Sequence, residues 1–205
     1  TINLLLVLLN YPTPELTLRP LRAALHELTR LPGSRVALID NGSGDDSVPV
    51  LAGALEREGL KDRVDLITSP ANLGFAGGVN LALRPALGGS NPPRFVYLLN
   101  SDALPAPGSI ERLVRVLDER PRAGIAGSYI HGPAGDTHDT AFRFPSVASN
   151  FEESLGLGVV TRLLDRWVVS KPVPSETTRV DWLAGASMLI RREVFDAIGV
   201  YDENF

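Results

Sequence analysis

The feature that most constrains this chain is a regular alternation between short apolar runs and longer amphipathic stretches. Runs suited to strands lie at 2–9, 34–40, 63–69 and 94–99, and each is followed by residues with helix signals. Buried parallel strands read as nearly continuous apolar runs, because helices cover both faces of a parallel sheet. The alternation therefore predicts an α/β fold with a mostly parallel central sheet and helices on both of its faces.

Helices are predicted between these runs from caps and from apolar spacing. Thr13 is a suitable N-cap with Pro14 at the first helical position, and leucines then recur at helical spacing. Pro20 would lie inside this helix, so we expect a late start or a kink there. The other expected elements are helices at 45–58 and 110–117, a loop running into a helix at 74–87, a strand at 123–130, and a strand leading into a short helix at 181–195.

Composition excludes several classes of site. The 205 residues are 44% hydrophobic, which is enough for one sizeable core, and the absence of cysteine rules out disulfides, thiolate metal sites and a cysteine nucleophile. The formal net charge of −4 shows no basic excess, so nucleic acid is not expected as a partner. The apolar run at 4–9 is too short to span a bilayer.

Polar or glycine-rich turns follow all four predicted strands of the parallel series. In order along the chain these turns contain Asn10, Tyr11 and Pro12; Asp40, Asn41, Gly42 and Ser43; Pro70, Asn72, Gly74 and Phe75; and Asn100, Ser101 and Asp102. Ligands of such sheets bind beyond the carboxyl ends of the strands. Each turn taken alone has a structural explanation, such as an Asn-Gly turn or close packing by the glycines of GFAGG. The four together predict one polar, acidic crevice.

Asp102 is the most informative of these side chains. Pro105, Pro107 and Ser109 place the next helix too far along for Asp102 to cap it. A single carboxylate at a strand end suits Mg²⁺ or Mn²⁺, which keep several waters and bridge to substrate phosphates. Such a cation would stabilise a diphosphate leaving group. Asp40 could accept hydrogen bonds from a base or a ribose, since an ionised carboxylate only accepts.

Five sequence blocks, in this order, resemble the family 2 glycosyltransferases and in particular their rhamnosyltransferase-like branch. They are NYPTPELTLRPLRA, IDNGSGDDS, NLGFAGGVN, LLNSDALP and WLAGASMLIRREVFDAIGVYDENF. The resemblance implies a single GT-A domain over 1–205, the Rossmann-like fold of nucleotide-diphospho-sugar transferases. Its nucleotide-binding half would be 1–130 and its acceptor-side half 131–205. It also implies inverting transfer of a sugar, with rhamnose as the leading donor sugar, from a dTDP- or UDP-linked donor.

The resemblance also assigns roles to individual residues. Asp40 resembles the aspartate that binds the base or ribose, and Asp102 the last residue of an Asp-X-Asp metal motif whose first acid is replaced by Asn100. Trp182, Gly185 and Ala186 resemble the segment that lines the donor and acceptor site, although Trp182 could equally be a core residue. The full nucleotide-binding set is Asn10, Tyr11, Asp40, Asn41, Ser43, Asn72, Gly74, Phe75, Gly78, Asn100 and Ser101.

Two departures from the family pattern bear on activity. Residues 80–83 read NLAL where the family often has Asn-Arg-Gly, so an arginine near the phosphates is missing. In the family a Glu-Asp pair that supplies the catalytic base follows the YDENF-like block closely, and the sequence ends at Phe205. We therefore expect the base beyond Phe205, with Asp202, Glu203 and Asp181 as weaker candidates. The 205-residue chain is expected to bind nucleotide but to turn over poorly, because transfer to a hydroxyl needs a base.

Other functions remain open from the sequence. The absence of a base also fits a catalytically silent module that binds nucleotide sugars. A sugar-nucleotide nucleotidyltransferase would need a glycine-rich, basic loop after the first strand, where this chain has NYPTPE. A dehydrogenase would need G-x-G-x-x-G at the same turn. The family branch implies a glycan or lipid-linked acceptor, and hence a cytoplasmic protein with peripheral association at the inner face of the membrane.

Overall fold

The computed structural model describes residues 3–132, 134–138, 140–142, 144, 174 and 176–204. The chain forms two compact units, one of Thr1–Ala126 with Gly185–Phe205, and one of Gly127–Ala184. The boundary lies close to residue 130, where we expected the two halves to meet, but the last 21 residues return to the first unit. The functional assignment of the two halves stays a prediction.

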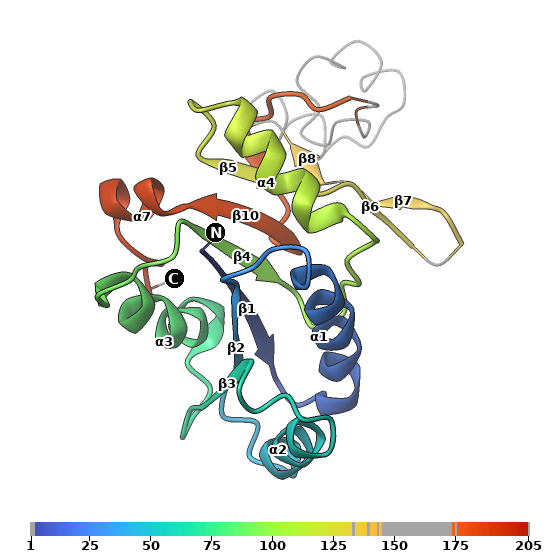
Figure 1. Ribbon diagram of the computed structural model, residues 1–205, viewed down its shortest axis with the longest axis vertical. Coiled ribbons are helices and arrows are strands. Elements are labelled where there is room, and N and C mark those ends of the chain that lie inside the picture. The colour runs from blue at the N-terminus through green and yellow to red at the C-terminus, as the bar shows by residue number, and fades with distance from the viewer. Residues whose placement is uncertain are drawn as a thin grey trace, which may run out of the picture. The chain divides into compact units, whose positions relative to one another are not determined.

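The first unit is built on a six-stranded sheet (Figure 1). Its strands in spatial order are β3 (Val64–Thr68), β2 (Arg35–Asp40), β1 (Leu4–Asn10), β4 (Phe95–Leu99), β10 (Ser187–Arg191) and β5 (Ile125–Gly127). The first four are mutually parallel, and β10 is antiparallel to β4. The mostly parallel sheet predicted from the apolar runs is therefore confirmed.

Helices cover both faces of this sheet, as the sequence predicted. Leu4, Leu6 and Leu8 of β1 share one core cluster with residues of α1 (Pro14–Leu28), α2 (Ser47–Arg57) and α4 (Ser109–Glu119). Leu5 and Val7 share the opposite cluster with residues of α3 (Gly74–Gly88) and α7 (Arg192–Ile198). Successive strand residues point to opposite faces, so β1 contributes side chains to both core clusters. In the described part of the chain, no helix has the length and apolar character needed to cross a membrane.

The structure corrects two expectations about helix starts. The first helix begins at Pro14, as its N-cap signals predicted, and runs through Pro20. Of the two alternatives expected at Pro20, a late start or a kink, the late start is therefore wrong. Pro20 removes one helical hydrogen bond, the one to the carbonyl of Leu16, and Leu16 is an exposed residue whose carbonyl can be hydrated. The third helix begins at Gly74 itself, whereas the first residues of 74–87 were expected to form a loop. Side chains of the preceding turn hold the chain at this point.

The second unit contains two short antiparallel pairs. β6 (Ile130–His131) pairs with β7 (Thr137–His138), and β8 (Ala141–Phe142) pairs with β9 (Trp182–Leu183). The strand expected to lead into a short helix over 181–195 is therefore split into β9 and β10, and the short helix follows at α7. Most of the stretch 150–180, which we expected to be less regular, lies outside the described residues.

Candidate functional site

The strand register brings the predicted polar residues to one edge of the sheet. Asn10 lies opposite Asp40, and Asp40 lies opposite Thr68 on the next strand. Leu8 lies opposite Leu99, so the residues that follow β4 run alongside the end of β1. In parallel strands the carboxyl ends share an edge, and the register therefore gathers the ends of all four strands there.

Between β1 and β2 this edge is closed by buried hydrogen bonds. Asn10 is 0% and Asp40 2% exposed. Asp40 Oδ1 accepts from Asn10 Nδ2 at 2.9 Å and from Ser43 Oγ at 2.6 Å, and Asp40 Oδ2 accepts the Ser43 backbone N–H at 3.2 Å. Thr17 of α1 donates to Asn10 Oδ1 at 2.7 Å. We call these four residues, Asn10, Thr17, Asp40 and Ser43, the Asp40 network.

Asn41 fastens the turn that precedes α3. Its Nδ2 donates to Asn72 Oδ1 at 3.1 Å and to the Gly74 carbonyl at 3.0 Å, and its Oδ1 accepts the Leu73 N–H at 3.2 Å. Asn72 Oδ1 also accepts the Gly74 N–H at 2.8 Å. These bonds fix the backbone of residues 72–74, and α3 begins at Gly74 directly after this turn.

Two glycines of the motifs are required by close packing. Gly42 has a φ of +69°, and a Cβ there would lie 2.2 Å from the carbonyl carbon of Ala71. A Cβ on Gly78 would lie 2.7 Å from Leu9 Cδ1 and 3.0 Å from Asn41 Cγ. The packing interpretation that the sequence left open for GFAGG thus holds for Gly78. A direct contact of Gly78 with a nucleotide stays a prediction.

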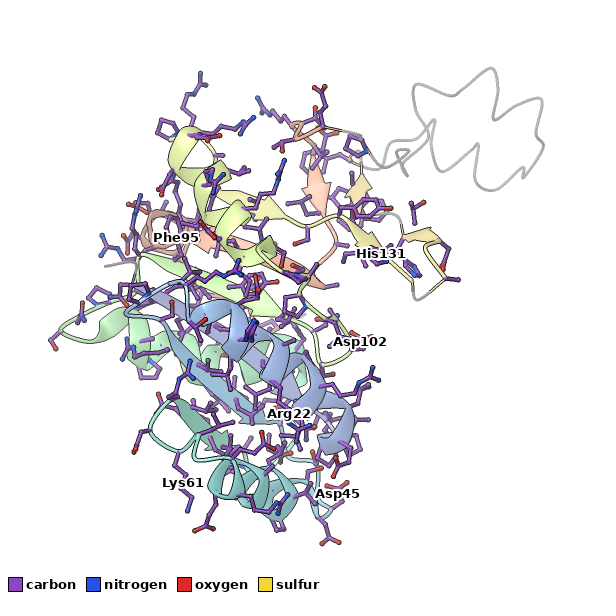
Figure 2. The ribbon with its side chains drawn as sticks, turned by 45° about the vertical axis from the view of Figure 1, so that its right-hand side comes forward. Arg22, Asp45, Lys61, Phe95, Asp102 and His131 are labelled. Atoms are coloured by element: carbon purple, nitrogen blue, oxygen red, sulfur yellow. The ribbon has the colours of Figure 1, made fainter. Side chains whose placement is uncertain are left out.

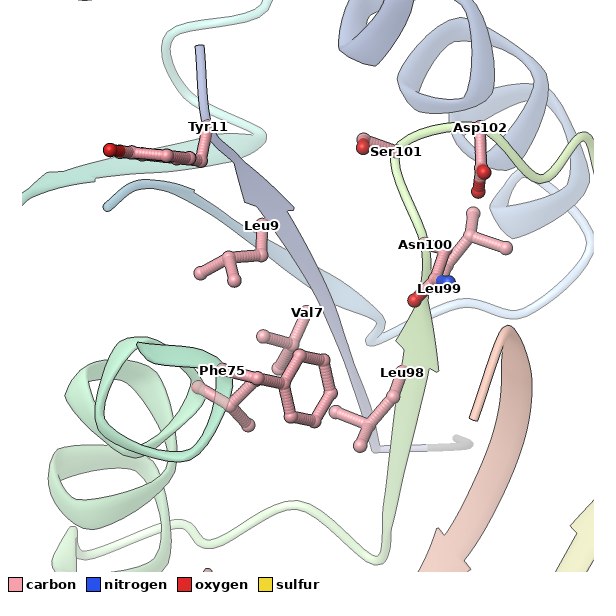
Figure 3. A pocket seen from close by; sticks show the side chains of 10 residues that line it. Val7, Leu9, Tyr11, Phe75, Leu98, Leu99, Asn100, Ser101 and Asp102 are labelled. Carbon is pink, nitrogen blue, oxygen red and sulfur yellow. The ribbon is translucent and has the colours of Figure 1, made fainter. Parts of the chain in front are cut away.

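Between β1 and β4 the same edge opens into a cavity of about 240 Å³ (Figure 3). Its apolar floor is formed by Val7, Leu9, Val79, Leu98 and Leu99, and its rim by Tyr11, Phe75, Asn100, Ser101 and Asp102. Figure 3 shows the last three of these across the end of β1 from Tyr11. All five rim residues were predicted from the sequence as ligand contacts. The lining does not include Asp40, Asn41, Ser43 or Asn72.

Asp102 is exposed on the loop after β4 (Figure 2) and makes no hydrogen bond or ion pair with any described residue. The loop is turned by a hydrogen bond from the Ala103 N–H to the Asn100 carbonyl at 3.2 Å. The next helix begins only at Ser109, after Gly108, whose N–H donates to the buried Glu27 carboxylate at 2.5 Å. Asp102 therefore does not cap α4, as the prolines in this loop predicted.

The cavity lies beyond the carboxyl ends of the strands, where open α/β sheets bind their ligands. Comparison with known proteins shows the family of the chain. The family described as Glycosyl transferase family 2 matches residues 15–199, most of the chain. The chain belongs to glycosyl transferase family 2. Two curated relatives, both named N-acetylglucosaminyl-diphospho-decaprenol L-rhamnosyltransferase, come from Mycobacterium tuberculosis strains CDC 1551 / Oshkosh and ATCC 25618 / H37Rv. Each is 32% identical over 193 residues, covering 89% of this chain; the chain spans 60% of the length of these relatives.

Solved structures of glycosyltransferases share the fold at low sequence identity. The mannosyltransferase PcManGT from Pyrobaculum calidifontis, in complex with GDP-Man and Mn²⁺, matches with a TM-score of 0.65 and 18% identity, over 98% of this chain and 48% of its own. S. aureus TarS 1-349 in complex with UDP-GlcNAc matches with a TM-score of 0.63 and 13% identity, again over 98% and 48%. The predicted GT-A fold is thus confirmed for this family 2 chain.

The segment before the C-terminus of this family 2 domain is held on α3 by Asn80, which is 1% exposed. Asn80 Nδ2 donates to the Tyr201 carbonyl at 2.8 Å and to Glu203 Oε1 at 2.7 Å, and Asn80 Oδ1 accepts the Tyr201 N–H at 3.2 Å. Arg84 pairs with the same Glu203 oxygen at 2.9 Å. The Tyr201 ring packs edge-on against the Phe75 ring, with 5.8 Å between the ring centroids. This contact joins the C-terminal segment to the cavity rim. Burial raises the pKa of Tyr201, which keeps its phenol neutral.

The three candidate bases all have partners among the described residues. Asp202 accepts from the backbone N–H of Asn204 at 2.9 Å and from its side chain at 2.8 Å, and these bonds lower the pKa of the Asp202 carboxyl. Glu203 accepts a hydrogen bond from Asn80 and pairs with Arg84. Asp181, in the second unit, accepts the Phe144 N–H at 3.2 Å. A carboxylate with a lowered pKa is a weaker base. The identity of the base stays a prediction, and Phe205 lies outside the described residues.

The predicted donor and acceptor segment is divided between the two units. The Ala186 carbonyl accepts the Asn100 N–H at 3.0 Å, so Ala186, preceded by Gly185, lies beside the end of β4. Trp182 belongs to the second unit, where it stacks on Phe142 at 4.2 Å and is 41% exposed. That exposure does not fit the alternative in which Trp182 is a core residue.

Four residues that organise the site were not predicted from the sequence: Thr17, Glu27, Asn80 and Tyr201. Thr17 and Glu27 carried a signal, because both are polar residues on the buried face of an amphipathic helix. Asn80 also lies among apolar helix positions. Tyr201 gave no comparable signal, since its partner lies 121 residues earlier in the chain.

Proposed function

We propose that this chain is the donor-binding domain of an inverting glycosyltransferase, which moves a sugar from a nucleotide diphosphate to a hydroxyl of a glycan or lipid-linked acceptor. The observation that carries the proposal is Asp102, an exposed carboxylate without a described partner on the rim of the strand-end cavity. Family membership supports the reaction class. The named relatives are rhamnosyltransferases of a diphospho-decaprenol acceptor, which supports rhamnose as the sugar and a lipid-linked acceptor.

The donor would lie along the carboxyl edge of the sheet. Ligand pockets usually enclose roughly 300–1,000 Å³, so a nucleotide sugar would extend from the cavity of about 240 Å³ over neighbouring strand ends. The diphosphate would lie near Asn100, Ser101 and Asp102. The base and ribose would reach toward Asp40. α3 begins at Gly74 beside the cavity, and a helix N-terminus favours anionic groups such as phosphates.

A divalent cation, Mg²⁺ or Mn²⁺, fits at Asp102. Mg²⁺ in particular is bound in proteins through one or two carboxylates, with waters and substrate phosphates as its other ligands. The described residues hold no group of three or more His, Asp or Glu side chains that could enclose an ion, so a carboxylate shared with substrate phosphates is the suitable type of site. The neighbour PcManGT was solved with Mn²⁺. The cation would offset the negative charge of the leaving diphosphate.

Turnover also needs a base at the acceptor hydroxyl. Asp202 and Glu203 accept internal hydrogen bonds, which favours a base outside these two residues, and we place it beyond Phe205. The same observation supports the second candidate function, a module that binds nucleotide sugars without efficient transfer. A decaprenol-type acceptor would bring the protein to the inner face of the membrane from the cytoplasm, as a peripheral protein.

Calorimetric titration tests the donor site. Wild type, Asp102→Ala and Asp62→Ala are titrated with UDP and with dTDP, each with and without Mn²⁺. Asp62 is a matched control, since it is an exposed aspartate just before β3, at the opposite edge of the sheet. We expect binding that depends on Mn²⁺, is weakened at least about tenfold in Asp102→Ala, and is unchanged in Asp62→Ala. The tighter nucleotide identifies the carrier.

Two results would overturn parts of the proposal. Equal binding by wild type with and without Mn²⁺ would remove the metal role of Asp102. Failure of wild type to bind either nucleotide would remove the donor-site assignment.

A further inference from the structure

The amide of Asn10 is fully buried and has chemically opposite partners at its two ends. Asn10 is 0% exposed, as is Thr17, while Asp40 is 2% exposed. On one side Thr17 Oγ1 lies 2.7 Å from Asn10 Oδ1. On the other side Asn10 Nδ2 lies 2.9 Å from Asp40 Oδ1 and 3.3 Å from Ser43 Oγ. The amide thus joins helix α1 to the carboxylate at the end of β2.

The partners determine which way the amide must point. An ionised carboxylate can only accept, so the NH₂ group of Asn10 must face Asp40 and its carbonyl must face Thr17. A carbonyl also only accepts, so the hydroxyl of Thr17 must donate to it. That hydroxyl has one proton, and the Thr13 carbonyl, 2.9 Å away, competes for it. Whether the Asn10 carbonyl receives a hydrogen bond therefore depends on where Thr17 sends its proton.

We propose that Thr17 is a positioning residue of the nucleotide site, which acts through Asn10 on Asp40. With its amide held by Thr17, Asn10 occupies Asp40 Oδ1 together with Ser43. Asp40 Oδ2 accepts one described hydrogen bond, the Ser43 N–H at 3.2 Å, and a carboxylate oxygen has two lone pairs. Oδ2 therefore keeps a lone pair that could accept a hydrogen bond from a ribose or base. The inference rests on the proposed function, in which Asp40 receives that part of the donor.

The hydroxyl is not needed to fill space or to complete the helix. Thr17 lies on the buried face of α1, next to Leu18 and one turn before Leu21, where an apolar residue of the same size would pack. Its bond to the Thr13 carbonyl is a local bond within the helix that leaves the backbone pattern unchanged. Thr17 is 0% exposed and does not line the cavity, so it can affect a ligand only through the residues it contacts, here Asn10 and then Asp40.

The experiment compares the two ends of the donor. Wild type, Thr17→Val and Thr17→Ser are titrated with the tighter of UDP and dTDP, and with pyrophosphate, all in Mn²⁺. Thr17→Val leaves Asn10 Oδ1 buried and unpaired, which frees the amide to turn and weakens nucleotide binding about tenfold. Pyrophosphate binding stays unchanged, because pyrophosphate engages only the Asp102 side. Thr17→Ser keeps the hydroxyl and keeps nucleotide affinity near the wild-type value.

Controls separate positioning from folding. Thr29→Val removes a hydroxyl from the C-terminal end of the same helix, where it donates to the His26 carbonyl, and should change neither affinity. If Thr17→Val does not fold, Thr17→Ala and Thr17→Ser replace it, since both lose the methyl group and only the alanine loses the hydroxyl.

The outcomes also separate the inference from the function on which it rests. Wild-type nucleotide affinity in Thr17→Val, or a parallel loss of nucleotide and pyrophosphate binding, overturns the inference and leaves the donor site intact. A wild-type chain that binds pyrophosphate but neither nucleotide overturns the proposed function, and the inference with it.

Discussion

Between β1 and β2 the carboxyl edge of the sheet is filled by the Asp40 network, whereas between β1 and β4 the same edge opens into the cavity. The two regions each contain an aspartate just after or at the end of a strand. Asp40 is 2% exposed and accepts three hydrogen bonds from Asn10 and Ser43. Asp102 is exposed and has no hydrogen bond or ion pair with the residues that the structure describes.

This difference follows from the alternation of side chains along β1. Leu4, Leu6 and Leu8 face the α1 side, and Asn10 continues that series into the network. Val7, Leu9 and Tyr11 face the α3 side and line the cavity. A shift of one residue along a strand changes the face, so neighbouring polar residues enter different environments. The closed region should therefore contribute more to the free energy of unfolding than the open rim does.

The largest effect on stability is expected at Gly42, inside the closed region. Gly42→Ala combines a positive φ with a Cβ 2.2 Å from the backbone of Ala71, whereas Gly44→Ala, at a φ of +71°, meets nothing within 4 Å. Urea denaturation should show a loss of about 1–2 kcal/mol in the free energy of unfolding for Gly44→Ala. Gly42→Ala should lose roughly a further 1–3 kcal/mol. Equal losses of unfolding free energy in the two variants would show that the Ala71 backbone moves easily to make room for a Cβ, and that the closed region is loosely packed.

The second prediction compares the two aspartates directly. Asp40→Ala leaves the buried Nδ2 of Asn10 without its carboxylate partner and should lower the free energy of unfolding by about 2–3 kcal/mol. Asp102→Ala removes no described contact and should stay within about 0.5 kcal/mol of wild type. Urea midpoints of the two variants, measured at one pH with unchanged slopes, test this. Similar losses for both would contradict the contrast between a closed and an open region.

The fold was predictable because buried parallel strands and amphipathic helices leave local patterns. The four parallel strands begin and end within two residues of the apolar runs. The motif residues Tyr11, Phe75, Asn100, Ser101 and Asp102 were also predicted, and they line one cavity. Local sequence identified these residues because each follows directly from a strand end or opens a helix.

The division of the site into two regions was not predictable in the same way. The number of hydrogen bonds that the Asp40 carboxylate accepts depends on the β1–β2 register and on the packing of Thr17 from α1 against Asn10. The Asn80 contacts with Tyr201 and Glu203 span more than 120 residues and leave no local pattern. Glycines 42 and 78 gave the turn and packing signals, but the atoms that exclude a Cβ, on Ala71 and Leu9, come from other elements. Tertiary contacts, not propensity, decide these points.

A small effect on stability is also expected at Phe75, on the open rim. Phe75 is 47% exposed, and its described ring contact is the edge-on one with Tyr201 at 5.8 Å. Phe75→Ala should therefore cost no more than about 1 kcal/mol of folding free energy, while weakening UDP or dTDP binding by about three- to tenfold through the lost aromatic contact. Leu104→Ala is the control, because Leu104 is 55% exposed on the loop after β4 and does not line the cavity. Calorimetry and urea denaturation of both variants measure the two quantities. A Phe75→Ala loss of stability as large as that of Asp40→Ala, with unchanged affinity, would mean that the rim supports the fold and that the ligand lies elsewhere.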